Sequence, residues 1–432
     1  MKPVRRSMNL KIRTLLIAVI ALNVICLASD NQNTPDANNL VSLEDYLRYA
    51  ELNNASLKAA FEQWKITAEQ IPQAKTLPDP KFTYEVETKR SPSGQTFGLS
   101  QMLPWFGTIE ARTEAAKASE KAAEKRYQAQ KLKLFADVKT AFYEYSYLAR
   151  QVEIARENLE LLKHFEEIAR IRYTASETTH PDIILAQIEL TTMENELKNI
   201  ELMRKPTVIK LNSILNRQSS AMLPWPRREN FPETKLNADD IIALLIKNNP
   251  DLQAMDFDIS AARQQVELAK KRFYPEMEFG VNSMYRSEAT MGPGRDPLYG
   301  MVSLTLPIWR DSYNAAQQQA QADVRRVQQE KREIQNSTVA RAANLLYDFE
   351  ISARNSKLYK DVLIPKSKEL LTACESAYQA GNIDSLSLID AQRRLLKYKL
   401  LYEQAVIENA QKLAELEMLV GTQISNVDTA GK

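Results

Sequence analysis

The dominant pattern along the chain is a long run of helix-forming residues without glycine or proline, from Thr108 to His180. A continuous helix over this run would be about 110 Å long, several times the width of an ordinary domain. Tyr143, Tyr147 and Leu148 widen its apolar stripe, so we expect it to pack against neighbours on two sides, in a wall or tube of helices. The stripe has a spacing close to the repeat of supercoiled helices, and its members are Val138, Phe142, Tyr145, Ala149, Val152, Ala155, Leu159, Leu162, Phe165 and Ala169.

Two shorter regions alternate apolar and polar residues with a period of two. In the first, Phe82, Tyr84 and Val86 alternate with polar residues, and Phe97 and Leu99 do so after a turn. The second region repeats this alternation, and both predict hairpins with one apolar face. The expected strands span residues 81–89, 96–104, 276–287 and 298–306.

Each expected strand is about ten residues long, near the length that crosses a bilayer when tilted. Four strands cannot close a barrel, and open sheet edges in lipid would leave backbone amides unpaired at a cost of several kcal/mol each. We therefore expect several copies of the chain to combine, and three copies would give a barrel of twelve strands. The fold class is mostly α with a small β part, in which long α-helical hairpins accompany four transmembrane strands per chain.

The order of elements occurs twice, which indicates an internal duplication. The segment Asn53–Leu57 matches Asn248–Leu252, at an offset of 248 − 53 = 195 residues, and Leu103-Pro104 matches Leu306-Pro307. The first unit is expected over 43–237 and the second over 238–421. Within them we expect long helices at 108–180, 182–217, 311–380 and 384–420, a shorter helix at 43–75, and a C-terminal tail at 422–432.

The N-terminus has the features of a secretory signal peptide. An apolar run over 15–27 follows five cations, and no acidic residue occurs before Asp30. We expect residues 1–28 to be removed by cleavage after Ala28, leaving a polar segment over 29–42. Cys26 could instead carry a lipid anchor, and this alternative stays open. The five cations are Lys2, Arg5, Arg6, Lys11 and Arg13.

Composition narrows the remaining classes of function. Removing the five cations leaves 57 − 5 = 52 basic against 55 acidic residues, a net charge of 52 − 55 = −3. This near-neutral body, without a basic run, gives little support to a nucleic-acid partner. Cys374 is then the only cysteine left, which excludes an internal disulfide. No second apolar run of about 20 residues is present to form a membrane-spanning helix.

Several motifs resemble the outer-membrane efflux channel family typified by TolC. In the second unit they are Ala377–Gly381, Leu388–Arg393 and Ala414–Gly421. The opening of the first hairpin, Leu77–Pro80, and the segment Ser100–Pro104 are more similar to the heavy-metal, CzcC-like branch of that family. The resemblance covers nearly all of residues 40–421.

The resemblance implies a homotrimer in the cell outer membrane of a Gram-negative bacterium, with a barrel pore and an α-helical tunnel across the periplasm. It also implies that residues 206–237 form part of an equatorial belt around the waist of the tunnel. Its partners would be outer-membrane lipid, a periplasmic adaptor (membrane fusion) protein and an inner-membrane RND-type pump. The implied function is passive efflux, with heavy-metal cations as the substrate that the branch suggests. Export of drugs or other small organic molecules, and type I protein secretion, stay open as alternatives.

No group of residues has the spacing of a catalytic, metal or cofactor site, so we expect neither an enzyme nor a bound cofactor. His164 and His180 are the only histidines, and they lack the paired spacing of a metal or nucleophile motif. A rival hypothesis of a different class is an exported coiled-coil scaffold. A scaffold would account for the long helices but not for two hairpins with an apolar face.

The resemblance places candidate selectivity residues near the turns between the long helices. Asp390 lies at an acidic position just inside the periplasmic mouth, and Ser387 replaces the neighbouring acid of the family pattern. Asp182, the counterpart of Ser387 in the first unit, could restore that charge, and Asp384 is a further candidate. Rings of like charge from three chains would filter by sign. The alternative is that Asp182 caps its helix and Asp390 is merely solvated.

Other candidates would act on gating and assembly. Arg172, Tyr173 and Arg393 could hold the mouth shut through hydrogen bonds to neighbouring coils, and the alternative is that they pack as ordinary surface residues. Contacts with the adaptor are expected at the turns themselves, at Ser176, Glu177, Gly381 and Asn382.

Overall fold

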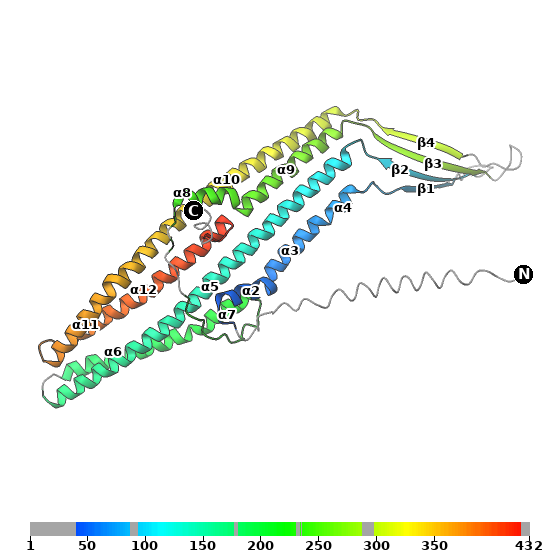
Figure 1. Ribbon diagram of the computed structural model, residues 1–432. Helices are drawn as coiled ribbons and strands as arrows, with labels where there is room; N and C mark the ends of the chain where they lie inside the picture. Colours follow the sequence, from blue (N-terminus) through cyan, green and yellow to red (C-terminus); the bar gives the residue numbers. More distant parts are fainter. Residues whose placement is uncertain are drawn as a thin grey trace, which may run out of the picture.

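The molecule is elongated, with a β-sheet at one end, two helical turns at the other and long helices between them (Figure 1). This computed structural model describes residues 40–86, 94–176, 180–229, 234, 236–286 and 298–424. The expected signal peptide lies outside these residues, as do most of the polar segment 29–42 and most of the tail 422–432.

Each half of the chain contains helices, a β-hairpin and further helices, in that order. The first half consists of α2 (Leu43–Asn53), α3 (Ala55–Ala68), α4 (Gln70–Lys75), β1 (Lys81–Val86), β2 (Gly94–Leu103), α5 (Thr108–Thr174), α6 (His180–Leu202) and α7 (Arg204–Ile214). The second consists of α8 (Ala238–Asn248), α9 (Pro250–Lys271), β3 (Glu276–Arg286), β4 (Leu298–Thr305), α10 (Arg310–Leu358), the π-helical turn η2 (Tyr359–Leu363), α11 (Ile364–Gln379) and α12 (Ser385–Val420).

Helix α5 is the continuous rod that the sequence predicts, with 67 residues. Its predicted end at His180 is wrong, because the helix stops at Thr174 and Ser176 takes a left-handed backbone conformation with φ of 62°. The expected seam is largely buried, including Val138, Phe142 and Tyr145.

Prolines divide three of the other expected helices into shorter ones. The helix expected over 182–217 is two helices, because Pro206 has no N–H to donate to the carbonyl of Leu202 and its ring crowds that carbonyl. Pro72 has the same effect at Ala68, and the helix expected over 43–75 is also broken at Asn54. The helix expected over 311–380 is interrupted by η2, which ends two residues before Pro365.

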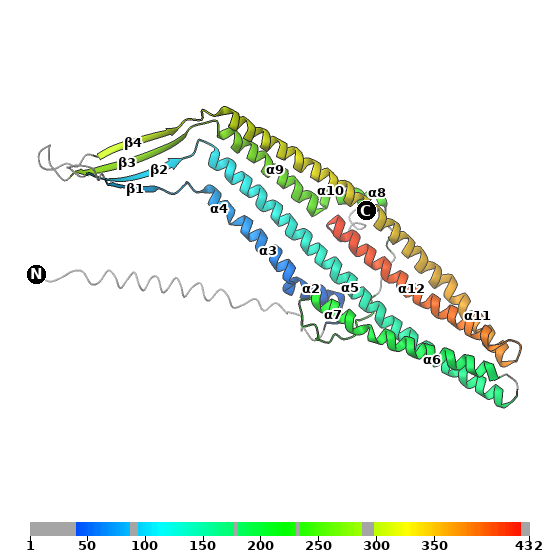
Figure 2. The same cartoon turned by 180° about the vertical axis from the view of Figure 1, so that it is seen from behind.

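The helices form one layer, and the helices that lie beside α5 differ between its two halves (Figures 1 and 2). In the half next to the sheet, α3, α5, α9 and α10 lie side by side. In the half next to the turns, α6, α5, α12 and α11 lie side by side. Only α5 and the α10–η2–α11 rod extend through both halves, so the other two rods are built from separate helices placed end to end.

A buried asparagine joins the helices at each of these two joints. The Asn54 Oδ1 accepts a hydrogen bond from the Leu57 N–H at 2.9 Å, which caps α3, while its Nδ2 donates to the Ile214 carbonyl at the end of α7, at 2.7 Å. The Asn54 backbone N–H also donates to the Ala50 carbonyl of α2 at 2.8 Å. One residue therefore satisfies backbone groups at the ends of three helices, which would otherwise be left without partners in the interior.

The second half repeats this joint with the same chemistry. The Asn249 Oδ1 accepts from the Leu252 N–H at 2.9 Å, its Nδ2 donates to the Leu419 carbonyl of α12 at 2.8 Å, and its N–H donates to the Leu245 carbonyl of α8 at 2.9 Å. The matched segments found in the sequence therefore mark the two joints.

The sheet has four antiparallel strands in the order β1-β2-β3-β4, so β2 and β3 join the two hairpins. The register aligns Phe82, Leu99 and Val281 across three strands, and aligns Thr83, Gly98 and Asn282 in the next row. Apolar and polar side chains therefore occupy opposite faces, as the alternation predicts. On the apolar face Phe82 and Leu298 have 69% and 73% of their surface exposed in the single chain.

Glycines on the polar face make room for larger neighbours. A Cβ atom at Gly98 would clash with the Asn282 Oδ1, and one at Gly280 would lie 3.0 Å from the Met301 Cε. The Ser100 hydroxyl donates to Glu278 on the same face at 2.6 Å. In the part of the chain that the structure describes, no helix combines the length and the apolar composition needed to span a membrane.

We predict that Asn249→Ala destabilises the helical layer by about 2–4 kcal/mol, because it removes the cap of α9 and leaves the buried Leu419 carbonyl without its donor. Thermal unfolding of the detergent-solubilised protein, followed by far-UV circular dichroism, should show a lower midpoint. Asn199→Ala, at an exposed position of α6, is the control and should leave the midpoint unchanged. Equal midpoints for both variants would show that the joint contributes nothing.

Candidate functional site

The two helical turns lie together at the end of the molecule opposite the sheet (Figure 1). In the α11–α12 turn, Gly381 has φ of 78°, its N–H donates to the Tyr378 carbonyl at 3.1 Å, and the Asn382 N–H donates to the Ala377 carbonyl at 2.9 Å. In the α5–α6 turn, Ser176 occupies the matching left-handed position, and its N–H donates to the Tyr173 carbonyl at 3.0 Å. Glu177 lies outside the described residues.

Arg172 ties the first turn to the second within one chain. Its side chain is buried at the end of α5, although most arginines are exposed. Its Nη1 donates to the Tyr378 carbonyl, and its guanidinium lies over the Tyr378 ring at 4.7 Å from the centroid. A charge-assisted hydrogen bond and a cation–π contact therefore hold the two turns together.

Two further contacts connect α6 to α12 behind the turns. The Ser385 hydroxyl at the start of α12 donates to Asp182 in the first turn of α6. The Arg393 guanidinium binds both carboxylate oxygens of Glu189, with an Nε–Oε1 distance of 2.9 Å. Tyr173 packs its half-exposed ring against His180, with 5.6 Å between ring centroids. The two candidate latch arginines thus bind partners in their own chain.

The remaining acidic candidates stand at the start of α12. The Asp384 Oδ1 accepts from the Ser387 N–H at 3.0 Å and caps the helix, and hydrogen bonding from Ser387 lowers the pKa of the Asp384 carboxyl. Asp390 lies one and a half turns further on, exposed, where its carboxylate accepts from the Arg394 Nε at 2.8 Å. Asp390 is therefore ion-paired with a cation of its own helix.

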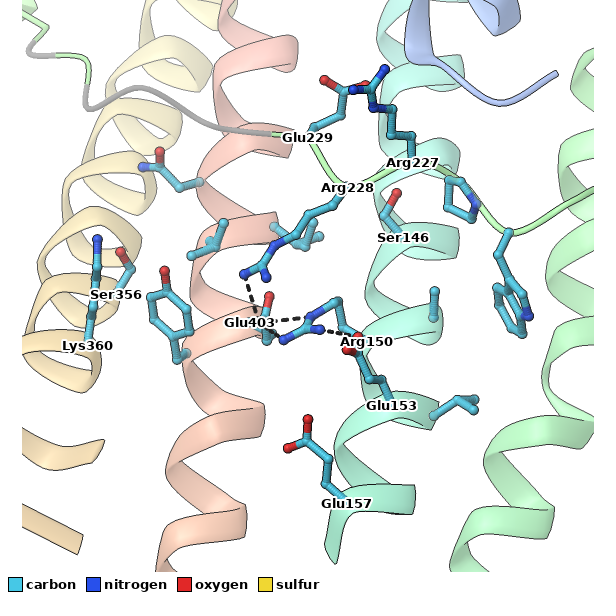
Figure 3. Close-up of a pocket in the computed structure, with 18 of the residues that line it drawn as sticks. Ser146, Arg150, Glu153, Glu157, Arg227, Arg228, Glu229, Ser356, Lys360 and Glu403 are labelled. Carbon is cyan, nitrogen blue, oxygen red and sulfur yellow. Dashed lines mark hydrogen bonds and ion pairs between the residues drawn. The ribbon is translucent and has the colours of Figure 1, made fainter. Parts of the chain in front are cut away.

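A cleft of about 1350 Å³ lies at mid-length between α5, α12 and the α10–η2 rod (Figure 3). Residues 223–229, which we call the strap, cover one side of it. Buried Glu403 at its wall accepts hydrogen bonds from the Arg150 Nε and Nη2 at 3.1 and 2.9 Å, and the Arg228 Nη2 of the strap lies 3.6 Å from it. Arg150 also pairs with Glu153. This carboxylate links two helices to the strap.

The strap is anchored by an aromatic and cationic stack. The Trp225 ring stacks on Tyr145 of α5 with centroids 5.1 Å apart, and the Arg204 guanidinium lies 4.2 Å from the Trp225 centroid. The Tyr145 hydroxyl and the Arg204 Nη2 both donate to the Leu223 carbonyl, at 3.1 and 2.9 Å. Sequence reasoning placed this segment in an equatorial belt over 206–237 but missed the cleft, and residues 206–214 belong to α7 instead.

The described residues at the turns and around the cleft form helical walls that carry paired charges. Among the residues that the structure describes, no three or more His, Cys, Asp or Glu side chains are grouped so as to hold a metal ion. The paired charges at the turns and in the cleft fix the helices relative to one another.

A family model described as "Outer membrane efflux protein" matches residues 47–217 and 241–422. The cobalt-zinc-cadmium resistance protein CzcC of Cupriavidus metallidurans is 21% identical over 393 residues, covering 88% of this chain and 90% of that protein. The pyoverdine export outer membrane protein OpmQ of Pseudomonas putida is 22% identical over 333 residues, covering 74% of this chain and 68% of that protein.

Solved structures share the fold at lower identity. The outer-membrane channel OprN superposes with a TM-score of 0.75 at 16% identity, covering 88% of this chain and 89% of that one. The outer membrane protein VceC of Vibrio cholerae gives a TM-score of 0.75 at 16% identity, covering 88% of this chain and 96% of that one.

Arg172→Gln should loosen the contact between the two turns, because the buried Tyr378 carbonyl loses a charged donor. Losing a hydrogen bond to a charged group costs about 1.5–3 kcal/mol, so amide hydrogen exchange in residues 376–384 should accelerate about tenfold or more. Arg170→Gln is the matched control, since Arg170 is exposed and pairs with Glu166 one turn away on the same helix. Identical exchange in both variants would contradict the proposed tie.

Proposed function

The chain belongs to the outer membrane efflux protein family, and on that premise we propose that it is the trimeric outer-membrane conduit of a tripartite system that exports heavy-metal cations. Family membership itself confirms the resemblance seen in the sequence, the location in the outer membrane of a Gram-negative bacterium, and a channel function rather than an enzymatic one. The trimer, the partners and the substrate are the proposed part.

The sheet is the observation that carries the proposal. Its apolar face is exposed across all four strands, with Phe82, Leu99, Val281 and Val302 among its members, while Ser100, Glu278 and Asn282 lie on the opposite, polar face. β1 and β4 are edge strands with one paired neighbour each. In lipid such edges need partners, so β1 of one chain would pair with β4 of the next until three chains close a twelve-stranded barrel.

The helical end would receive the other components of the system. The turns at Ser176, Gly381 and Asn382 are exposed, and they stand at the far end of the rods from the sheet. With the sheet in the outer membrane, these turns point into the periplasm. We therefore place the contact with a periplasmic adaptor there, and through the adaptor a link to an inner-membrane RND-type pump.

The names of the relatives indicate two classes of exported substrate. Cobalt, zinc and cadmium are suggested by the name of the relative CzcC, whereas OpmQ, at similar identity, exports pyoverdine. Export of small organic molecules is therefore the second candidate. Protein secretion and an exported scaffold have no comparable support from the relatives described above.

The membrane role of the sheet can be tested with a pair of adjacent lysines. Val302→Lys places a charge on the apolar face at a cost of about 2–4 kcal/mol in the bilayer, whereas Ser303→Lys points to the polar face beside Glu278. We expect only Ser303→Lys to accumulate as a trimer in outer-membrane fractions, as measured by native mass spectrometry after detergent extraction. Equal accumulation of both variants would argue against a lipid-facing surface.

The substrate can be tested by growth. A strain that lacks this chain should become more sensitive to cobalt, zinc and cadmium salts, and a plasmid copy should restore resistance. Its sensitivity to dyes and antibiotics should not change. The opposite pattern, with sensitivity to organic compounds alone, would favour the second candidate.

A further inference from the structure

The exposed stripe of α12 nearest the turns carries more positive than negative charge. Residues 390, 394 and 397 are spaced by four and three positions and therefore share one side of the helix. Asp390, Arg394 and Lys397 are all exposed, and the uncharged Ser387 precedes them on the same side. One carboxylate on this stripe is thus followed by two cations.

The contacts of the Asp390 carboxylate reduce the influence of its charge further. The Asp390 carboxylate and the Arg394 Nε are 2.8 Å apart, and 56% of each side chain is exposed. On the neighbouring face Arg393 is balanced by Glu189 of α6. Asp182 is bound by Ser385, and Asp384 caps the start of α12 behind the stripe. None of these contacts adds a negative charge beside Asp390.

This inference rests on the proposed function of the protein as a conduit. We propose that Arg394 is a specificity-determining residue that cancels the charge of Asp390 at the periplasmic mouth. Three chains then contribute three carboxylates and three guanidiniums at nearly the same level, with three lysines one turn further in. Such a mouth has no net negative ring. Cationic cargo would enter without being held, because conduction requires binding weak enough for release.

Single-channel recording in planar lipid bilayers tests this inference. For the wild-type trimer, Mg²⁺ and La³⁺ added on the side of the helical turns should block little current. Arg394→Gln should expose the Asp390 ring and lower the half-blocking concentration about threefold or more, with the permeability ratio shifted towards cations. Asp390→Asn should shift the ratio towards anions, and the double variant should behave like the wild type.

A matched control uses the opposite half of the molecule. Arg326 on α10 is exposed in the half next to the sheet, where it pairs with Glu330 at 2.6 Å and with Asp323 at 2.8 Å. Arg326→Gln removes the same charge from an exposed cluster of paired charges on a helix and should leave block and selectivity unchanged. All substituted side chains are exposed, and trimer formation is checked first for each variant.

The outcomes separate this inference from the proposed function. A wild-type channel that Mg²⁺ blocks strongly, with the block relieved by Asp390→Asn, would overturn the inference and leave the conduit in place. Conductance that responds to neither Asp390 nor Arg394 would overturn it as well, because the stripe would not face the path. A trimer without any ion current would contradict the conduit itself, and the inference with it.

Discussion

A helix can end inside a protein only if its last carbonyls and first amides find partners, and this constraint determines how the rods are built. Asn54 and Asn249 each supply an acceptor to one helix and a donor to another, while the backbone of the same residue closes a third. The side-chain amide is short and carries both functions, which no charged or apolar side chain of that size does. Because of these joints, two rods that are built from several shorter helices can extend alongside the whole of α5.

The joints also decide where the layer changes its members. At Asn54 the layer passes from α3 to α7, and at Asn249 it passes from α9 to α12. The short helices α2 and α8 branch off at the same points, since their last turns end on these two asparagines. The strap and the cleft also lie at mid-length. There Glu403 connects α12 to Arg150 of α5 and to Arg228 of the strap.

The two halves of the chain share one order of helices and strands. They differ in the side chains that hold the two helical turns together. Both turns use a left-handed residue, a glycine at 381 and a serine at 176. Only the first half supplies the buried Arg172, and only the second supplies Tyr378 as its partner. The halves thus repeat one architecture, and the differences between their side chains produce the contacts that fix one turn against the other.

The sequence by itself determined the elements whose signal is local. The absence of glycine and proline predicted α5, the alternation of apolar residues predicted the two faces of the sheet, and matched motifs predicted the duplicated order. It missed helix ends by several residues where the cause was a turn conformation at Ser176 or a proline such as Pro206, because those effects act on the hydrogen bonds of the preceding turn. The resemblance to the efflux channel family also identified Asp390 as a candidate selectivity residue, and Arg172 and Arg393 as candidate gating residues.

Only the tertiary structure decided which partners these residues have. Arg172 and Tyr378 are 206 positions apart, and Arg393 and Glu189 are 204 apart. No local pattern encodes such pairings, because they depend on how two helical hairpins lie against each other. The same holds for the cleft, whose walls come from α5, α12 and the strap. Asp390 and Arg394 are close in sequence, yet their pairing also depends on both remaining on the exposed side of α12.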